Sequence, residues 1–88
     1  MQRLLKRPDK YLASEVDGEV ILVHGDTGAF FALKDVGLAI WHKLDQQPEL
    51  EAVCEDLQEE FEVDAAECRQ SVDRFARELV EAGFAEFA

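Results

Sequence analysis

Gly28-Ala-Phe-Phe-Ala-Leu-Lys-Asp-Val-Gly-Leu-Ala-Ile-Trp41 is the most informative stretch of this chain, because it holds a strand and a helix with almost no loop between them. Residues 29–33 form a short apolar and aromatic run after the turn dipeptide Thr27-Gly28, which predicts a strand. Asp35 is the predicted N-cap of a helix, since apolar residues then recur at three- and four-residue spacing up to Leu44. A strand and a helix joined this closely must share one core.

Two further strands are predicted upstream of this joint. Residues 11–16 alternate loosely in polarity and are followed by Asp17-Gly18, a strong hairpin-turn dipeptide. Residues 19–24 are a nearly continuous apolar run, which predicts a strand buried on both faces. Gly25-Asp-Thr-Gly28 supplies the next reversal. Residues 11–33 therefore predict a three-stranded antiparallel meander, which is too small to be stable without a helical cover.

Two helices are predicted directly after the strands. The first covers residues 35–44, where Trp41 is expected to be a core anchor. The second covers residues 49–61 and carries one apolar stripe among its carboxylates. The stripe consists of Leu50, Val53, Cys54, Leu57 and Phe61.

A third helix is predicted to begin at Asp64, with Glu67 three residues on as the capping-box partner. Gly83 ends this helix, and Phe84 is expected to fold back on its last turn. The predicted class is α+β, a winged helix-turn-helix-like arrangement in which a three-stranded antiparallel sheet is followed by three helices. The apolar stripe of the third helix consists of Cys68, Val72, Phe75, Ala76, Leu79 and Val80.

The composition predicts one folded domain. The chain has 88 residues, of which 48% are hydrophobic and 33% charged. We expect the domain to span residues 11–88, after a basic and flexible segment over residues 1–10. The longest apolar run, Val20-Ile-Leu-Val23, is far too short to span a membrane, and no secretory signal is recognisable. A cytoplasmic location with no membrane partner is the resulting expectation.

The charge of the chain argues against nucleic acid as a partner. The net charge is −11, and residues 49–67 hold nine carboxylates and no basic residue. Such a surface repels phosphate backbones. The third predicted helix carries Arg69, Arg74 and Arg77 against a larger number of carboxylates, which suits the major groove of DNA poorly. A DNA-binding winged helix, suggested by the order of the helices alone, remains the alternative from another functional class.

Motifs of catalysis and cofactor binding are not recognisable in the sequence. There is no glycine-rich phosphate loop and no metal-ligand spacing of cysteine and histidine, so no cofactor and no metal are expected. His24 and His42 are predicted to be surface or boundary residues. Cys54 and Cys68 fall on apolar helix faces, where a free thiol acts as a small hydrophobe. We therefore expect a protein that is not an enzyme.

The strand over residues 29–33 is the remaining candidate site. In a three-stranded meander it is an edge, whose unpaired backbone groups can accept another strand. Phe30 and Phe31 point to opposite faces, so one of them faces away from the main core or lines a groove beside a helix. A peptide added at this edge and a purely structural role for both aromatics fit the local residues equally well. The same edge allows a monomer or a weak homodimer.

A set of segments between Tyr11 and Phe84 matches, in order and spacing, one known pattern: Glu15-Val-Asp-Gly-Glu-Val-Ile-Leu-Val23, Thr27-Gly-Ala-Phe-Phe-Ala-Leu33, Val36-Gly-Leu-Ala-Ile-Trp41, Leu57-Gln-Glu-Glu-Phe-Glu-Val63, Val72-Asp-Arg-Phe75 and Leu79-Val-Glu-Ala-Gly-Phe84. The pattern resembles the PqqD-like family, whose members are the peptide-binding modules called RiPP recognition elements. Two departures are visible. Lys34 stands where members often have Asn, and Ser71 stands where many carry an acidic residue.

The resemblance implies a non-catalytic protein that binds the leader segment of a ribosomally made precursor peptide. The leader adds as a strand beside residues 29–33 and lies in the groove formed with the third helix. The implied contacts on the strand are Ala29, Phe30, Phe31, Ala32 and Leu33. Those on the helix are Arg69, Ser71, Val72, Asp73, Ala76 and Val80.

The resemblance also implies enzyme partners. A free-standing domain of this kind is similar to the recognition protein of a lasso-peptide pathway, which acts beside a leader peptidase and a macrocyclase. The alternative within the family is a peptide chaperone for a radical-SAM enzyme, as in pyrroloquinoline quinone biosynthesis. A structural adaptor that binds a folded protein is a further interpretation.

Overall fold

Strands β2 (Tyr11–Val16), β3 (Glu19–His24) and β4 (Phe30–Leu33) form an antiparallel sheet in the spatial order β2-β3-β4. The two-residue turn between β2 and β3 has positive φ at both positions, +52° at Asp17 and +79° at Gly18. These angles are those of the hairpin turn whose twist matches the flanking strands, which explains the Asp-Gly dipeptide. The predicted meander is confirmed.

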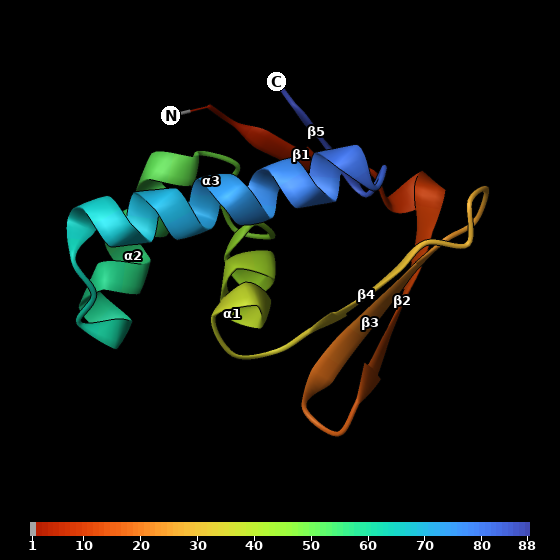
Figure 1. Ribbon diagram of the computed structural model, residues 1–88, viewed down its shortest axis with the longest axis horizontal. Coiled ribbons are helices and arrows are strands. Elements are labelled where there is room, and N and C mark those ends of the chain that lie inside the picture. The colour runs from red at the N-terminus through yellow and green to blue at the C-terminus, as the bar shows by residue number, and fades with distance from the viewer. Residues whose placement is uncertain (1) are drawn as a thin grey trace.

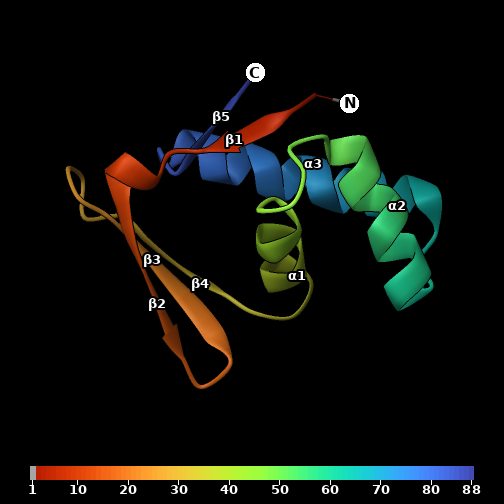
Figure 2. The ribbon, with the colours of Figure 1, turned by 180° about the vertical axis from the view of Figure 1, so that it is seen from behind.

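Helices α1 (Asp35–Lys43), α2 (Leu50–Phe61) and α3 (Ala65–Glu81) follow the sheet, and the computed structural model describes residues 2–88. The predicted α+β class, with three strands followed by three helices, is confirmed. In both views α2 crosses α3, α1 lies below α3, and the sheet reaches away from the helices (Figures 1 and 2).

The two faces of the sheet have different environments. Val20, Leu22 and Leu33 point to the inner face and are buried in the core beneath the helices. Leu12, Val23 and Phe30 point to the outer face and are exposed. The prediction that β3 is buried on both faces is therefore wrong. An apolar run does not reveal whether helices cover one face of a strand or both.

Of the two predicted N-caps, at Asp35 and Asp64, one forms in the structure. The Asp64 carboxylate accepts a hydrogen bond from the backbone N–H of Glu67 at 3.3 Å, so the predicted cap of α3 is confirmed. Asp35 is the first residue of α1 and not its cap, and it has a φ of +53°. The N-cap of α1 is Lys34, whose side chain makes no capping hydrogen bond. The predicted cap of α1 is therefore wrong.

The C-terminus of α3 closes with a paired hydrogen-bond motif. Gly83, with a φ of +86°, donates its N–H to the carbonyl of Val80, and Phe84 donates to the carbonyl of Leu79. This is the Schellman arrangement, which reverses the chain after a glycine. It places the Phe84 ring in the core, 5.1 Å from the ring of Phe31 and 5.9 Å from that of Tyr11. Phe84 therefore joins the sheet to the end of α3, a contact with the strands that the sequence did not predict.

The segment before β2 is part of the fold. Strand β1 (Leu4–Lys6) pairs antiparallel with β5 (Ala85–Phe87), so both ends of the chain lie side by side in a second small sheet (Figures 1 and 2). Leu4 is 1% exposed, which makes it a core residue. In the described residues 2–10, the basic N-terminal segment therefore packs on the domain that was predicted to begin at residue 11.

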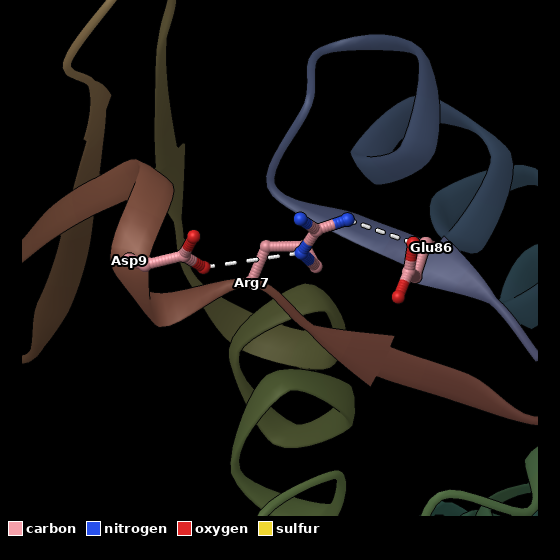
Figure 3. Close-up of polar contacts among 3 residues, drawn as sticks. All are labelled: Arg7, Asp9 and Glu86. Atoms are coloured by element: carbon pink, nitrogen blue, oxygen red, sulfur yellow. Dashed lines mark hydrogen bonds and ion pairs between the residues drawn. The ribbon is translucent and has the colours of Figure 1, made fainter.

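Arg7 ties the N-terminal segment to the C-terminal strand. Its guanidinium lies 2.7 Å from the Glu86 carboxylate and 3.8 Å from the Asp9 carboxylate (Figure 3). Its backbone N–H donates to the carbonyl of Phe84 at 2.9 Å. Because the contacts of Arg7 with Phe84 and Glu86 join segments far apart in the sequence, no local pattern predicts them. The turn η1 (Pro8–Lys10) then leads directly into β2.

The Lys6 side chain lies over the Trp41 ring at the edge of the core. Its ammonium group lies 3.8 Å from the centre of the Trp41 ring and 2.6 Å from the Asp45 carboxylate. Burial lowers the pKa of Lys6, and the bond to Asp45 opposes that shift. Trp41 is 5% exposed, which confirms it as a core anchor.

His24 is buried, which makes the prediction of a surface or boundary residue wrong. It is 7% exposed, and its Nδ1 atom accepts hydrogen bonds from the backbone N–H groups of Asp26 at 3.1 Å and Thr27 at 3.3 Å. The imidazole therefore holds the turn over residues 25–28 that leads into β4. Since its partners are backbone groups, sequence patterns give no sign of this role.

Candidate functional site

The free edge of β4 presents backbone groups of two residues. The β2–β3 turn makes Val16 and Glu19 a hydrogen-bonded pair, and such pairs alternate along an antiparallel ladder. The backbone N–H of His24 donates to the carbonyl of Ala29, at the end of β4. Every second residue of β3 counted back from His24, including Leu22, therefore directs its backbone groups toward β4. Phe31 and Leu33 consequently bond to β3, as partners of Leu22 and Val20. The N–H and C=O groups of Phe30 and Ala32 therefore point away from β3.

A groove lies between this edge and α3. It encloses about 330 Å³, and β4 forms one wall while Phe75 and Glu78 of α3 form the other. Within residues 2–88, β4 pairs with no strand other than β3. An edge strand that faces a groove is the geometry for strand addition, in which backbone bonds supply affinity and pockets select side chains. We call this space the β4–α3 groove; its lining is Phe30, Phe31, Ala32, Leu33, Phe75 and Glu78.

The groove continues along α3 toward α2. Phe75 and Glu78 also line a hollow of about 240 Å³ beside α1, which adds Ser71 and Arg74. Ser71 in turn lines an apolar hollow of about 190 Å³ between the ends of α2 and α3. Shared lining residues place the three spaces next to one another in a row along α3, and we call this row the channel. Its charged side chains are Arg74, Glu78 and Glu67, so the channel carries both signs of charge.

The strand residues predicted for the site are brought together. Phe30 is 66% exposed and points to the outer face, whereas Phe31 is half-buried against Phe84. The sequence left a groove and a purely structural role equally open for this aromatic pair. The structure gives Phe31 a share in both the core and the groove, and it leaves Phe30 out of the core.

Most helix residues predicted for the site do not face β4. Of the predicted set, Ser71 lines the channel. Arg69 pairs with Glu51 of α2, and Asp73 pairs with Arg77 at 2.8 Å along α3 itself. The remaining three, Val72, Ala76 and Val80, belong to the core or pack against it, and Val72 also lines the apolar hollow between α2 and α3.

Arg74, Phe75 and Glu78 were missing from the predicted site. Together with Ser71 they stand at positions 71, 74, 75 and 78, which is the three- and four-residue spacing of one helix face. The signal was present in the sequence, but Phe75 was attributed to the core stripe. Helical periodicity shows which residues share a face and does not show what that face meets.

Two residues predicted for apolar stripes also line the channel. Val36 of α1 is 40% exposed and Phe61 of α2 is 44% exposed. Both border the apolar hollow at the end of α2. Large exposed apolar side chains around a hollow are typical of a binding surface.

Cys54 and Cys68 are buried in the core, in agreement with their predicted role as small hydrophobes. The Cys68 thiol lies 3.7 Å from the backbone carbonyl of Cys54 and donates to it. Burial raises the pKa of the Cys54 thiol to about 12, and the neighbouring Cys68 adds to that shift. The thiol of Cys54 therefore stays protonated at neutral pH and is a weak nucleophile.

Across residues 2–88, no group of three or more His, Cys, Asp or Glu side chains is placed to hold a metal ion. No helix in the same range is long and apolar enough to cross a membrane.

The fold and the groove define a class of protein: a small winged-helix-like α+β domain whose edge strand lies open beside a helix. The chain belongs to the PqqD family, because residues 19–85 match the family described as Coenzyme PQQ synthesis protein D (PqqD). No curated protein sequence matches the chain.

Two solved structures are similar to the whole chain. The first, "TbiB1 in Complex with the TbiA(beta) Leader Peptide", has 29% sequence identity and a TM-score of 0.83, over 93% of this chain and 95% of that one. The second, "Lasso peptide synthetase B1 complexed with the leader peptide", has 24% identity and a TM-score of 0.83, over 96% and 98% of the two chains. At 24% identity, the second likeness supports the fold alone.

Proposed function

We propose that this protein is a non-catalytic recognition protein that binds the leader segment of a ribosomally synthesised precursor peptide. The leader adds as a strand to β4 and lies in the β4–α3 groove. The observation that carries the proposal is the open edge of β4, where Phe30 and Ala32 direct backbone groups toward a groove walled by α3. Membership of the PqqD family and the likeness to TbiB1, which was solved with a leader peptide, support it.

The choice of β4 over β2 follows from what lies beside each edge. Both are edge strands of the sheet, so both have unpaired backbone groups. Backbone bonds alone do not distinguish one peptide from another, whereas a groove adds side-chain selection. Phe75 and Glu78 supply that second wall at β4. The proposed contact residues are therefore Ala29 to Leu33 on the strand side and Ser71, Arg74, Phe75 and Glu78 on α3.

The proposed partners are the enzymes that process the precursor. A leader peptidase and a macrocyclase are the partners that the resemblance to the recognition protein of a lasso-peptide pathway implies. The PqqD family takes its description from the synthesis of coenzyme PQQ, and a radical-SAM enzyme is the corresponding partner in that pathway. Purified enzymes of each kind, encoded beside this chain, distinguish the two settings by which one acts faster on the precursor when this protein is added.

An amide NMR titration with the leader peptide of a precursor encoded beside this chain tests the function. The amides of Phe30 and Ala32 should shift and exchange more slowly with solvent, because they gain hydrogen-bond acceptors. Amides of residues 71–78 on α3 should shift as well. Binding of the peptide without a shift in the amide signals of residues 29–33 would contradict strand addition. Complete absence of binding contradicts the function itself.

A further inference from the structure

Four charged side chains of α3 form two neighbouring pairs of opposite charge at four-residue spacing, and they differ in whether the pair is closed. Asp73 and Arg77 form an ion pair at 2.8 Å along the helix. Arg74 and Glu78 stand one position further on, and both line the channel. Within residues 2–88, neither Arg74 nor Glu78 has an ion-pair partner. An acidic residue placed N-terminal to a basic one is the favoured order on a helix, which Asp73 and Arg77 have and Arg74 and Glu78 lack. The pair that faces the groove is therefore open to the charges of a ligand.

We propose that Arg74 and Glu78 select leaders that carry an acidic and a basic side chain with one residue between them, on the strand beside β4. This inference rests on the proposed function, since it names the charge pattern of the peptide that the groove binds. Along the helix axis, Arg74 and Glu78 are separated by about 6 Å. Two residues of an extended strand cover about 6.6 Å, and residues at that spacing point to the same face. A strand that lies along the channel therefore presents every second side chain at the spacing of the two charges.

The order of the two charges in the leader follows from the path of the chain. Glu78 lies beside β4 itself, in the space that Phe31 and Leu33 line. Arg74 lies beyond the end of β4, in the hollow that Gly37 of α1 lines. The sheet is antiparallel throughout, and antiparallel pairs are slightly more stable than parallel ones. A leader antiparallel to β4 passes Arg74 first and Glu78 second, so its sequence should read acidic-x-basic.

The two charges discriminate between leaders more than they add affinity. Both side chains are exposed, so each new ion pair contributes little by itself. The discrimination comes from the wrong leader, because a peptide with the reversed order places a carboxylate against Glu78 and a basic group against Arg74. Phe75 stands between the two charges in the sequence and lines the same two spaces, so it offers both peptides the same apolar contact. Backbone bonds and Phe75 therefore hold any leader, and the charges choose among leaders.

The test exchanges the charges on each side of the interface. The double variant with Arg74→Glu and Glu78→Arg reverses the pair and keeps the net charge of the chain at −11. Its matched control, with Asp73→Arg and Arg77→Asp, reverses the neighbouring pair, which does not line the channel. The probes are the leader peptide of a precursor encoded beside this chain and two series of its variants, in which Glu-x-Lys or Lys-x-Glu is moved along the leader one residue at a time. Competition fluorescence anisotropy measures the dissociation constant of each peptide.

At the position where Glu-x-Lys binds best, the wild type should bind it about tenfold more tightly than Lys-x-Glu, and a shift of the pair by one residue should abolish this preference. The exchanged variant should prefer Lys-x-Glu, the control should keep the wild-type preference, and both preferences should shrink at high salt.

Equal binding of the two series by the wild type overturns the selection by charge, and this comparison needs no variant to fold. An unchanged preference in the folded exchanged variant overturns it as well. A wild-type preference for Lys-x-Glu overturns the antiparallel placement of the leader. If the unmodified leader does not bind the wild-type protein at all, the proposed function itself fails.

Discussion

Substituting proline for Ala32 should weaken leader binding and leave the folded domain intact. The N–H of Ala32 points away from β3, so a proline there removes no hydrogen bond from the sheet. Proline is tolerated on an edge strand when its missing donor faces solvent. The matched control is Ala13→Pro. Ala13 is an exposed alanine on β2, and by the same alternation its N–H points to the free edge at the far side of the sheet.

The size of the effect follows from the number of outward donors. Over β4, the outward N–H groups belong to Phe30 and Ala32, so the substitution removes one of two. The leader carbonyl left facing it has no donor, which costs about 1–3 kcal/mol. The dissociation constant of the leader should therefore rise roughly 5- to 150-fold. The proline ring adds steric obstruction at the same edge.

Fluorescence anisotropy with a labelled leader peptide measures the effect, and thermal unfolding checks the fold. Ala32→Pro should bind weakly, while Ala13→Pro should bind like the wild type, and both should unfold close to the wild-type temperature. The reasoning fails if Ala13→Pro is the weaker binder, because the leader would then add to β2. It also fails if Ala32→Pro binds normally while remaining folded.

Three further outcomes are expected. Phe75→Ala should weaken leader binding by about 1–3 kcal/mol, whereas Arg69→Ala, whose guanidinium pairs with Glu51 on α2, should not change it; equal losses would show that the groove does not select the peptide. Gly83→Ala should lower the free energy of unfolding, measured by urea titration, by more than about 2 kcal/mol. The alanine would be forced to a φ of +86°, and its Cβ would lie 2.7 Å from His24 Nε2. The control Gly18→Ala has a φ of +79° but open space around the new Cβ, so it should lose only about 1–2 kcal/mol. For Cys54, the folded thiol has a pKa of about 12 and the unfolded thiol one of about 8.5, so the folded state keeps a proton that the unfolded state releases. The free energy of unfolding should then fall by about 1.4 kcal/mol per pH unit above about pH 8.5, and Cys54→Ala should lack this part of the slope when urea titrations at pH 8 and pH 10 are compared.

The chain's short-range patterns were sufficient for strands β2 to β4 and for the three helices, but not for β1 and β5. The Asp17-Gly18 turn, the Asp64 cap and the Gly83 stop each depend on residues within a few positions of one another, and each forms as predicted. One local prediction was wrong, the N-cap of α1 at Asp35, and the other wrong predictions concern residues whose environment a distant partner decides. His24 is buried because Gly83 and Phe84, just beyond α3, lie against it, and the outer face of β3 is exposed because no helix covers it.

The candidate site shows the same division. Alternation along residues 29–33 was enough to separate Phe30 from Phe31, and the edge position of the strand followed from the meander. The sequence did not tell which face of α3 meets the edge, since periodicity is identical whether a face meets core, groove or solvent. The Phe84 contacts and the pairing of β1 with β5 decide how α3 lies against the sheet, and thereby place Ser71, Phe75 and Glu78 at the groove. Local hydrogen bonds and turn angles depend on neighbouring residues, whereas a groove forms only when elements from separate parts of the chain pack together.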